Sequence, residues 1–356
     1  MLMRGGTSKG AVLLASDLPV DTALRDRVLL AIMGSPDLRQ IDGVGGAEPL
    51  TSKVAIVSGS TRPGIDVDYL FAQVLIDQPL VDVSPNCGNM LAAVGPFAIE
   101  RGLVVARHPL TKVAIHMVNT GSLAVAQVQT PDARVRYDGD TAIAGVPGTA
   151  APVAIDFLDT AGSVCESLLP TGRARDVATG VDVTCVDNGM PVVVITAASM
   201  GKTGYESPAD LDADLPFKAR LESLRLEAGR LMGLGDVTRR VVPKMTLISA
   251  PRAGGDVCTR TFIPHRCHAA IGVLGAVSVA TACALPGSVA EGIVRLPAGS
   301  PLVLSVEHPS GEFTVTLTVS GCSAADFSVG RSGILRTARA LMDGAVLIPH
   351  SVWNGA

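Results

Sequence analysis

Three short polar segments interrupt an otherwise apolar sequence and carry the residue types needed to bind and deprotonate an organic acid. They are RGGTSKG at 4–10, GGAEPLTSK at 45–53 and NCGN at 86–89. Glycine lets the backbone approach a ligand closely, hydroxyl and amide groups can bond carboxylate oxygens, and lysine or arginine supplies positive charge. The three segments therefore predict a site for a polyanionic small molecule.

Cys87 is the first candidate for proton transfer. It precedes a helix expected over 89–101, where Asn86 is a suitable cap and Gly88 leaves room for a substrate over the first amide groups. The positive end of a helix dipole favours the thiolate form of a cysteine, which eases loss and return of its proton. The alternative is a buried cysteine that serves only as a small apolar side chain.

Lys53 is the second candidate. It begins the run KVAIV at 53–57, which has the composition of a fully buried strand. Burial favours the neutral amine, and a neutral amine is a competent base toward a carbon acid. The alternative is a surface lysine at a strand end that keeps its ammonium group in water.

Other familiar sites are not indicated. His265, Cys267 and His268 are possible metal ligands, but no further ligands cluster at a matching spacing. The stretch GVGG at 43–46 lacks the spacing of a dinucleotide-binding loop, and no GxSxG motif is present. We therefore expect neither a metal nor another cofactor.

The elements that must position these residues are mostly strands. Apolar runs separated by turn-forming residues predict strands at 54–57, 70–76, 113–118, 124–128, 192–195, 246–248, 302–306 and 313–319. Helical patterns are fewer and cover 22–33, 89–101, 217–232, 269–283 and 337–342. Because strands dominate and do not alternate with helices, the sequence favours an α+β fold over a doubly wound parallel sheet.

Two of the expected helices, 89–101 and 269–283, are apolar nearly all round, which is typical of buried helices. Their starts align without gaps, CGNMLAAVG at 87–95 over CHAAIGVLG at 267–275. We therefore predict two related halves, each a curled, mostly antiparallel sheet around one central helix. The first half is expected to span 1–180, with 331–356 packing back on it, and the second 181–330, with the active site in the cleft between them.

The composition restricts the partners. The chain has 356 residues, 47% hydrophobic and 17% charged, with a formal net charge of -4. It contains no run of lysine and arginine, so neither nucleic acid nor an anionic membrane is indicated, and its longest uncharged stretch, 269–285, is short for a membrane span. Seven scattered cysteines favour free thiols in a reducing cytoplasm. We expect a cytoplasmic protein for a small molecule, with a homodimer as the suggested assembly.

Four longer motifs resemble one known family. RGGTSKG at 4–10, MGSPDLRQIDGVGGAEPLTSKVAIVS at 33–58, NCGNMLAAVGPFAIERG at 86–102 and IPHRCHAAIGVLGAVSVATA at 263–282 are similar to the 4-oxalomesaconate tautomerases and isomerases, a group that includes 2-methylaconitate isomerase. The resemblance covers most of the chain, from about residue 3 to near residue 342. Motifs of this length are more specific than any single triad or loop.

The resemblance implies the fold of diaminopimelate epimerase and a cofactor-independent proton transfer on an unsaturated oxo-tricarboxylate, as in bacterial breakdown of gallate or protocatechuate. It makes Lys53 the expected base and Cys87 the expected acid. The turn DNGMP at 187–191 resembles a substrate-binding turn of that fold. The residues expected to hold the substrate are Arg4, Thr7, Ser8, Ser52, Asn86, Gly88, Asn89, Asn188, Arg266 and His268.

Three alternatives remain open at this point. The first is isomerisation of 2-methylaconitate in propionate metabolism, with the same residue pair on a smaller substrate. The second is a two-cysteine amino-acid epimerase, which requires Cys267 opposite Cys87. The third is a non-catalytic accessory protein that binds a tricarboxylate.

Overall fold

The computed structural model describes residues 1–84 and 86–355. The chain divides into two units, and two strands each run from one unit into the other. Unit 1 comprises Met1–Asp156 and Leu335–Ala356, and unit 2 comprises Phe157–Ile334. Strands β8 (Pro152–Leu158) and β16 (Ser328–Met342) contain the two changes of unit. The C-terminal residues therefore belong to unit 1, and the expected boundary at residue 180 falls inside unit 2.

The strands of unit 1 form a continuous hydrogen-bonded series. In order they are β1 (Leu2–Gly5), β2 (Ser8–Leu14), β3 (Lys53–Gly59), β4 (Val67–Val74), β6 (Leu110–Met117) and β7 (Ser122–Gln129), with β5 (Val81–Asp82) on β4 and β16 on β1. The β2–β3 and β4–β6 pairs are parallel, whereas the β1–β2, β3–β4 and β6–β7 pairs are antiparallel.

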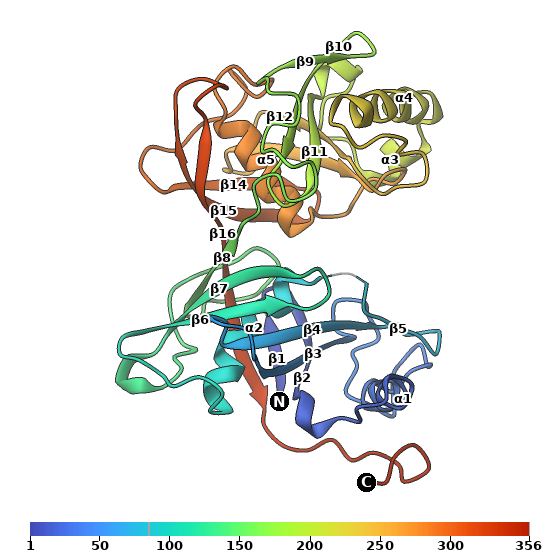
Figure 1. Ribbon diagram of the computed structural model, residues 1–356. Helices are drawn as coiled ribbons and strands as arrows, with labels where there is room; N and C mark the ends of the chain where they lie inside the picture. Colours follow the sequence, from blue (N-terminus) through green and yellow to red (C-terminus); the bar gives the residue numbers. More distant parts are fainter. Residues whose placement is uncertain (85, 356) are drawn as a thin grey trace. The chain divides into compact units, whose positions relative to one another are not determined.

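Helix α2 (Gly88–Glu100) is the central helix of unit 1. Figure 1 shows it among β1, β2, β3, β4, β6 and β7, all of which it contacts. Its residues 90–98 are buried, as the apolar sequence predicted. A Cβ atom at Gly95 would lie 2.9 Å from a methyl carbon of Val128, so a larger residue at this position would push β7 away.

Helix α1 (Thr22–Met33) covers the opposite face of the sheet. Asp21 caps its start by accepting a 2.8 Å hydrogen bond from the backbone N of Leu24. Its apolar face packs against Val54 and Ile56 of β3. Because successive side chains of a strand point to opposite faces, Lys53 points to the side of α2.

Unit 2 contains a second series of strands around a second central helix. In order the strands are β16, β15 (Gly311–Ser320), β14 (Leu302–His308), β13 (Val257–Phe262), β12 (Lys244–Ser249), β11 (Pro191–Thr196), β10 (Val181–Asp187) and β9 (Asp176–Ala178). Helix α5 (Val273–Ala284) contacts β10, β11, β14 and β15 (Figure 1) and is buried from Gly275 to Ala284. Helices α3 (Pro208–Ala213) and α4 (Leu215–Leu231) lie outside the sheet, and short 3-10 helices η1 (Ala15–Asp17), η2 (Pro131–Ala133) and η3 (Ala198–Met200) complete the described elements.

The two units repeat the same order of strand pairings. In unit 2, β11 is parallel to β12, β12 antiparallel to β13, β13 parallel to β14, and β14 antiparallel to β15. This is the order found for β2, β3, β4, β6 and β7, and in each unit the central helix follows the third strand of the set. The predicted α+β fold with two related halves is therefore confirmed.

Two helix predictions need correction. Residues 337–342 were expected to be helical, but they lie in β16, where Ala338 and Arg339 pair with Gly5 and Arg4 of β1. Pairing with a strand distant in the sequence overrides the weak local helical pattern. The helix expected from residue 269 begins at Val273, because Gly272 has extended backbone angles and serves as its N-cap.

Candidate active site

Lys53 and Cys87, the predicted proton-transfer pair, lie together in unit 1. Lys53 is the first residue of β3, and Cys87 is the N-cap residue of α2. The Lys53 Nζ donates a hydrogen bond to the Cys87 Sγ over 3.4 Å. Their side chains belong to the buried interior, with 9% and 8% of each residue exposed. The pair can therefore exchange a proton away from bulk water.

The position of Lys53 is fixed by tight strand packing. Lys53 lies opposite Gly10 in the parallel β2–β3 register, and a Cβ atom at Gly10 would come within 2.1 Å of the Lys53 carbonyl oxygen. Glycine at 10 is thus required for the two strands to pair here. On the other side, the Lys53 Nζ lies 5.2 Å from the centre of the Phe71 ring, a favourable cation–π contact.

The loop that leads into β3 is held by Gln40. The buried Gln40 amide donates to the hydroxyls of Ser35 (3.0 Å) and Ser52 (2.7 Å), and its oxygen accepts from the backbone N of Ala47 (2.9 Å). Ser52 in turn donates to the carbonyl of Val74 over 2.8 Å. Ser52 was expected to bind substrate, but both hydrogen bonds of its hydroxyl serve to anchor the loop.

Cys87 is positioned by Tyr69 of β4. The fully buried Tyr69 hydroxyl donates to the Cys87 carbonyl oxygen over 3.2 Å, and the backbone N of Leu91 donates to the same oxygen over 3.0 Å. Burial, and secondarily the nearby Cys87 thiol, raises the pKa of Tyr69 well above its usual value, so the phenol remains a donor. No side chain caps α2 at Cys87, which leaves the amides of the first turn available to an anion.

The hairpin between β1 and β2 lies on the start of α2. Cβ atoms at Gly5 and Gly6 would come within 2.4 Å of Asn89 atoms, and Gly6 has a positive φ of 51°. The Asn89 amide donates to the Thr7 hydroxyl over 3.0 Å. The predicted polar segments at 4–10 and 86–89 are therefore in direct contact.

Several polar atoms around this helix start lack partners. Within the described part of the chain, the buried oxygens Ser8 Oγ, Asn86 Oδ1 and Asn89 Oδ1 make no hydrogen bond. Leaving such groups unpaired is costly, so their grouping indicates a bound ligand or water. The Thr7 hydroxyl can donate as well as accept a hydrogen bond. If the Asn89 amide rotates so that its oxygen accepts from Thr7, its NH groups become available to a carboxylate.

The side chains of Arg4 and Asn86 already donate hydrogen bonds to other residues of the protein. The Arg4 guanidinium donates from one nitrogen to the carbonyl of Gly6 (3.0 Å) and to the carbonyl and hydroxyl of Thr337 (3.1 and 2.9 Å), which ties β1 to β16. The Asn86 amide donates to the Thr120 hydroxyl over 2.5 Å. These contacts are structural, and they hold the ends of the two polar segments in place.

Asn188 of unit 2 has a different role from the one the sequence indicated. Its Oδ1 accepts from Thr160 (2.6 Å), and its Nδ2 donates to Thr281 and Ser332 (2.8 Å each). The residue is fully buried, and both amide hydrogens are used. Asn188 therefore has no donor left for a substrate carboxylate and instead connects β16, α5 and the turn after β10.

Cys267 does not lie at a helix start. It is five residues before the Gly272 cap of α5 and belongs to an apolar cluster that includes Phe217 and Phe262. Its backbone N donates to Asp212 over 2.8 Å. Burial raises the pKa of the Cys267 thiol to about 11, against a smaller opposing effect of Arg260. The thiol therefore resembles a core side chain rather than a second counterpart of Cys87.

Arg266 and His268, which were also predicted to bind substrate, differ in their exposure to solvent. The Arg266 side chain is exposed, and its backbone oxygen accepts from Ile263 over 2.9 Å. His268 is half-buried, and its Nδ1 accepts from the backbone N of Ala270 over 2.8 Å. All seven cysteines are free thiols, in agreement with the sequence.

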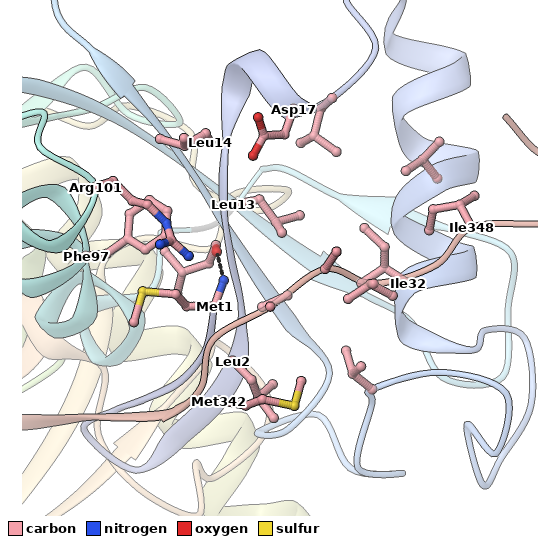
Figure 2. Close-up of a pocket in the computed structure, with 18 of the residues that line it drawn as sticks. Met1, Leu2, Leu13, Leu14, Asp17, Ile32, Phe97, Arg101, Met342 and Ile348 are labelled. Carbon is pink, nitrogen blue, oxygen red and sulfur yellow. Dashed lines mark hydrogen bonds between the residues drawn. The ribbon is translucent and has the colours of Figure 1, made fainter. Parts of the chain in front are cut away.

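A cavity elsewhere in unit 1 is not lined by the predicted proton-transfer pair. It has a volume of about 310 Å³ and lies between β2, α1 and the C-terminal segment (Figure 2). Its lining is mainly apolar, with Leu13, Ile32 and Ile348 as examples, and neither Lys53 nor Cys87 contributes. The cavity marks where the C-terminal residues cover the apolar face of α1, because Ile348 and Trp353 pack on the same core.

Two further features are absent from the described residues. In residues 1–84 and 86–355, no group of three or more histidine, cysteine, aspartate or glutamate side chains is placed to hold a metal ion. None of the helices in that same part of the chain is long and apolar enough to cross a membrane.

Sequence reasoning did not identify Tyr69, Phe71 or Gln40 as neighbours of the candidate site. Tyr69 and Phe71 lie in DYLFAQV at 68–74, where alternation predicts a half-buried strand but not which aromatic ring reaches the helix start. Gln40 lies within one of the motifs that carried the resemblance, yet nothing in its neighbours showed that its amide would be buried.

Known proteins match this chain along nearly its whole length. A family model described as PrpF protein matches residues 1–349. A 4-oxalomesaconate tautomerase of Pseudomonas putida is 58% identical over 100% of this chain and 97% of its own length. A (4E)-oxalomesaconate Delta-isomerase of a Novosphingobium species is 60% identical over 98% of this chain and 96% of its own length.

More distant proteins share the fold. A 2-methyl-aconitate isomerase of Shewanella oneidensis is 36% identical over 98% of this chain and 96% of its own length. A crystal structure of methylitaconate-delta-isomerase superposes with a TM-score of 0.86 at 36% identity, covering 100% of this chain and 96% of that one.

Proposed function

The chain belongs to the PrpF protein family, and on that premise we propose that it is a cofactor-independent isomerase of 4-oxalomesaconate. Its fold is the diaminopimelate epimerase-like fold that the sequence predicted. The relatives named for oxalomesaconate are 58% and 60% identical, whereas the one named for 2-methylaconitate is 36% identical. The identities therefore favour oxalomesaconate over the smaller, methylated acid.

The observation that carries this proposal is the 3.4 Å contact between the Lys53 Nζ and the Cys87 Sγ at the uncapped start of α2. An amine and a thiol in contact are one base and one acid, and together they can move a proton between two carbons of a single substrate. The arrangement serves an isomerisation, in which no electrons are gained or lost.

The chemistry follows from the substrate class. A ketone conjugated to an alkene acidifies the carbon at the end of the conjugated system. One member of the pair removes a proton from that carbon, and the resulting dienolate carries its charge on oxygen. Amide groups at the start of α2 and the glycine-rich hairpin can stabilise that oxygen. The other member then delivers a proton to a different carbon, which shifts the double bond.

Side chains around the pair supply the binding groups. We assign the substrate's carboxylates in unit 1 to Thr7, Ser8 and Asn89. The Ser8 hydroxyl is buried, unpartnered in the described structure and able to donate, and the Asn89 amide, once rotated so that its oxygen accepts from Thr7, offers its NH groups to a carboxylate. Gly88 leaves the adjoining amide groups uncovered. A cytoplasmic location is part of the proposal, since all seven thiols are free.

The test is direct conversion of the substrate. Purified protein is mixed with enzymatically generated 4-oxalomesaconate in deuterated water and followed by ultraviolet absorbance and proton NMR, with 2-methylaconitate as the comparison substrate. We expect rapid conversion of 4-oxalomesaconate with deuterium entering the allylic carbons. Conversion of 2-methylaconitate alone would overturn the oxalomesaconate assignment, and turnover of neither acid would overturn the isomerase proposal.

A further inference from the structure

The side chain of Asn119 takes the place of a strand beside β4. Strand β3 pairs along one edge of β4, and on the other edge β6 pairs only with 67–69 and β5 only with 73–74. Between these two pairings, the Asn119 amide accepts a hydrogen bond from the Phe71 backbone N and donates one to the Phe71 carbonyl oxygen, each over 2.8 Å. The amide therefore fills the gap that β6 and β5 leave along this edge.

The same turn holds the segment that leads to Cys87. Asn119 lies in the β6–β7 turn, residues 118–121, and its Nδ2 also donates to the carbonyl of Val83 over 2.6 Å. That carbonyl follows directly after β5 and lies four residues before Cys87. The next residue of the turn, Thr120, accepts a hydrogen bond from the Asn86 amide over 2.5 Å. Two consecutive side chains of the turn thus bond two points of the chain before Cys87.

The β6–β7 turn also contacts the two aromatic residues that support the pair. The backbone N of Val118 donates to the carbonyl of Tyr69 over 2.9 Å, and the Tyr69 hydroxyl donates to the carbonyl of Cys87. Phe71, whose backbone bonds the turn, carries the ring that lies 5.2 Å from the Lys53 Nζ. The turn therefore bonds the backbone of a neighbour of the thiol and of a neighbour of the amine.

Unit 2 fills the corresponding place in another way. By the registers of the β3–β4 and β12–β13 pairs, Thr261 of β13 corresponds to Phe71 of β4. The Thr261 carbonyl accepts a hydrogen bond directly from the backbone N of His268, in the segment before α5, over 2.7 Å. In unit 1 the Asn119 amide bridges the strand edge and the segment before the central helix. The side chain thus appears in the half that contains the lysine–cysteine contact.

Every hydrogen-bonding group of the Asn119 side chain is used in this bridge. Its oxygen accepts from Phe71, and its two NH groups donate to the carbonyls of Phe71 and Val83. Removal of the amide would leave three backbone groups without these partners, so the strand edge and the segment before Cys87 would move apart. Displacement of a reacting group by about 1 Å can lower a rate about 100-fold.

We propose that Asn119 is a positioning residue for the proton-transfer pair, because it fixes the strand that carries Phe71 and the segment that ends at Cys87 with a single amide. The catalytic use of the pair rests on the proposed function, whereas the positioning rests on the hydrogen bonds of Asn119 and on the contact between the Lys53 Nζ and the Cys87 Sγ. Asn119 itself touches neither member of the pair through a hydrogen bond and acts through their neighbours.

Kinetics of Asn119 variants distinguish positioning from substrate binding. For Asn119→Ala we expect kcat for 4-oxalomesaconate to fall about 10- to 100-fold with KM within about threefold, because the geometry of the pair changes and the carboxylate-binding groups do not. Asn119→Asp keeps the size and the acceptor for the Phe71 N but removes both donors, so it should lose as much. A rise in KM at constant kcat in Asn119→Ala, or full activity in Asn119→Asp, would overturn the proposal.

Thr130→Val is the matched structural control. The fully buried Thr130 hydroxyl bonds the Thr111 hydroxyl over 2.7 Å and the carbonyl of Arg107 over 2.6 Å, at the opposite end of the β6–β7 hairpin from the turn. Loss of these bonds should lower the Tm of the protein but leave kcat within about twofold of wild type. Equal losses of kcat in Thr130→Val and Asn119→Ala would show a general effect of stability and would overturn the positioning role.

A chemical probe of the pair keeps the test independent of turnover. o-Phthalaldehyde condenses with an amine and a thiol that are in contact, with loss of water, to give a fluorescent isoindole. We expect the wild type and Thr130→Val to form it between Lys53 and Cys87, identified by peptide mass spectrometry, and Asn119→Ala to form it about tenfold more slowly.

The two measurements separate the proposed function from the positioning role. If isoindole formation is slowed in Asn119→Ala but the wild type converts neither candidate acid, the proposed function fails and the positioning stands. If the wild type converts 4-oxalomesaconate and Asn119→Ala forms the isoindole at the wild-type rate, the function stands and the positioning fails. Absence of a Lys53–Cys87 isoindole in the wild type would overturn the positioning as well.

Discussion

The Lys53 Nζ and the Cys87 Sγ lie 3.4 Å apart although 34 residues separate them along the chain. Two independent constraints create this contact. The β2–β3 register places Lys53 at the end of its strand opposite Gly10, and the buried helix α2 begins directly after Cys87. A change that shifts either element by one residue would separate the amine from the thiol.

Replacement of either member of the pair should abolish isomerisation. Lys53→Met and Cys87→Ser should each lower kcat about 10²- to 10⁴-fold, the range for loss of one acid–base group. Proton NMR in deuterated water should show that each variant fails to exchange the hydrogen at one carbon, which assigns that carbon to the missing group. Lys112→Met, at an exposed position of β6, is the control and should retain full activity. Turnover within twofold of wild type in either variant would show that the pair is not catalytic.

Tyr69 should position Cys87 through a single hydrogen bond. Tyr69→Phe keeps the ring but removes the donor to the Cys87 carbonyl, so we expect kcat to fall about tenfold and the free energy of unfolding to fall by about 1–2 kcal/mol. Tyr205→Phe is the matched control, because that hydroxyl also donates to a carbonyl, of Ala250 over 3.0 Å, but on an exposed surface. Equal effects of the two variants on kcat would contradict a positioning role for Tyr69.

Cys267 should be dispensable. At neutral pH a thiol with a pKa of about 11 is protonated, so at about pH 8 roughly one molecule in a thousand carries the thiolate. Cys267→Ala should retain kcat within about twofold and change the free energy of unfolding by less than about 1 kcal/mol, since the volumes are similar. Activity assays and urea titration check both numbers. Loss of turnover in a folded Cys267→Ala protein would favour two-cysteine epimerase chemistry.

Asn188 should contribute to stability rather than to substrate affinity. Asn188→Ala leaves the buried hydroxyls of Thr160, Thr281 and Ser332 without their shared partner, so we expect the free energy of unfolding to fall by about 2–3 kcal/mol. Urea unfolding and steady-state kinetics on the folded fraction distinguish the two roles. A large rise in KM at unchanged stability would restore Asn188 as a carboxylate ligand.

Gln40 should keep the loop before Lys53 ordered. Gln40→Leu removes the acceptor of the Ala47 NH and the donor to Ser52, so the Ala47 amide should exchange with deuterium faster and the free energy of unfolding should fall by about 1–3 kcal/mol. Gln78→Leu, at an exposed position, should change neither quantity. Unaltered exchange at Ala47 in Gln40→Leu would show that the loop does not depend on this amide.

The sequence by itself determined the residue types at the site and the character of the elements around them. Local patterns are sufficient for such inferences. Lys53 begins an apolar run, Cys87 precedes an all-apolar helix, and glycines lie near both in the sequence. Such elements can be predicted because buried strands and helices have a regular pattern of apolar residues. The motifs also identified the family, since their length restricts them to one group of proteins.

Only the tertiary structure decided which of these groups are free to act. Asn188 and Ser52 looked like ligands, but partners from distant strands and loops use up their hydrogen bonds. Cys267 aligned with Cys87, yet the start of α5 at residue 273 leaves it in an apolar core. Tyr69 reaches the Cys87 carbonyl only because of its place in β4. Hydrogen-bond saturation, burial and register depend on segments far apart in the chain, and no local pattern in the sequence records them.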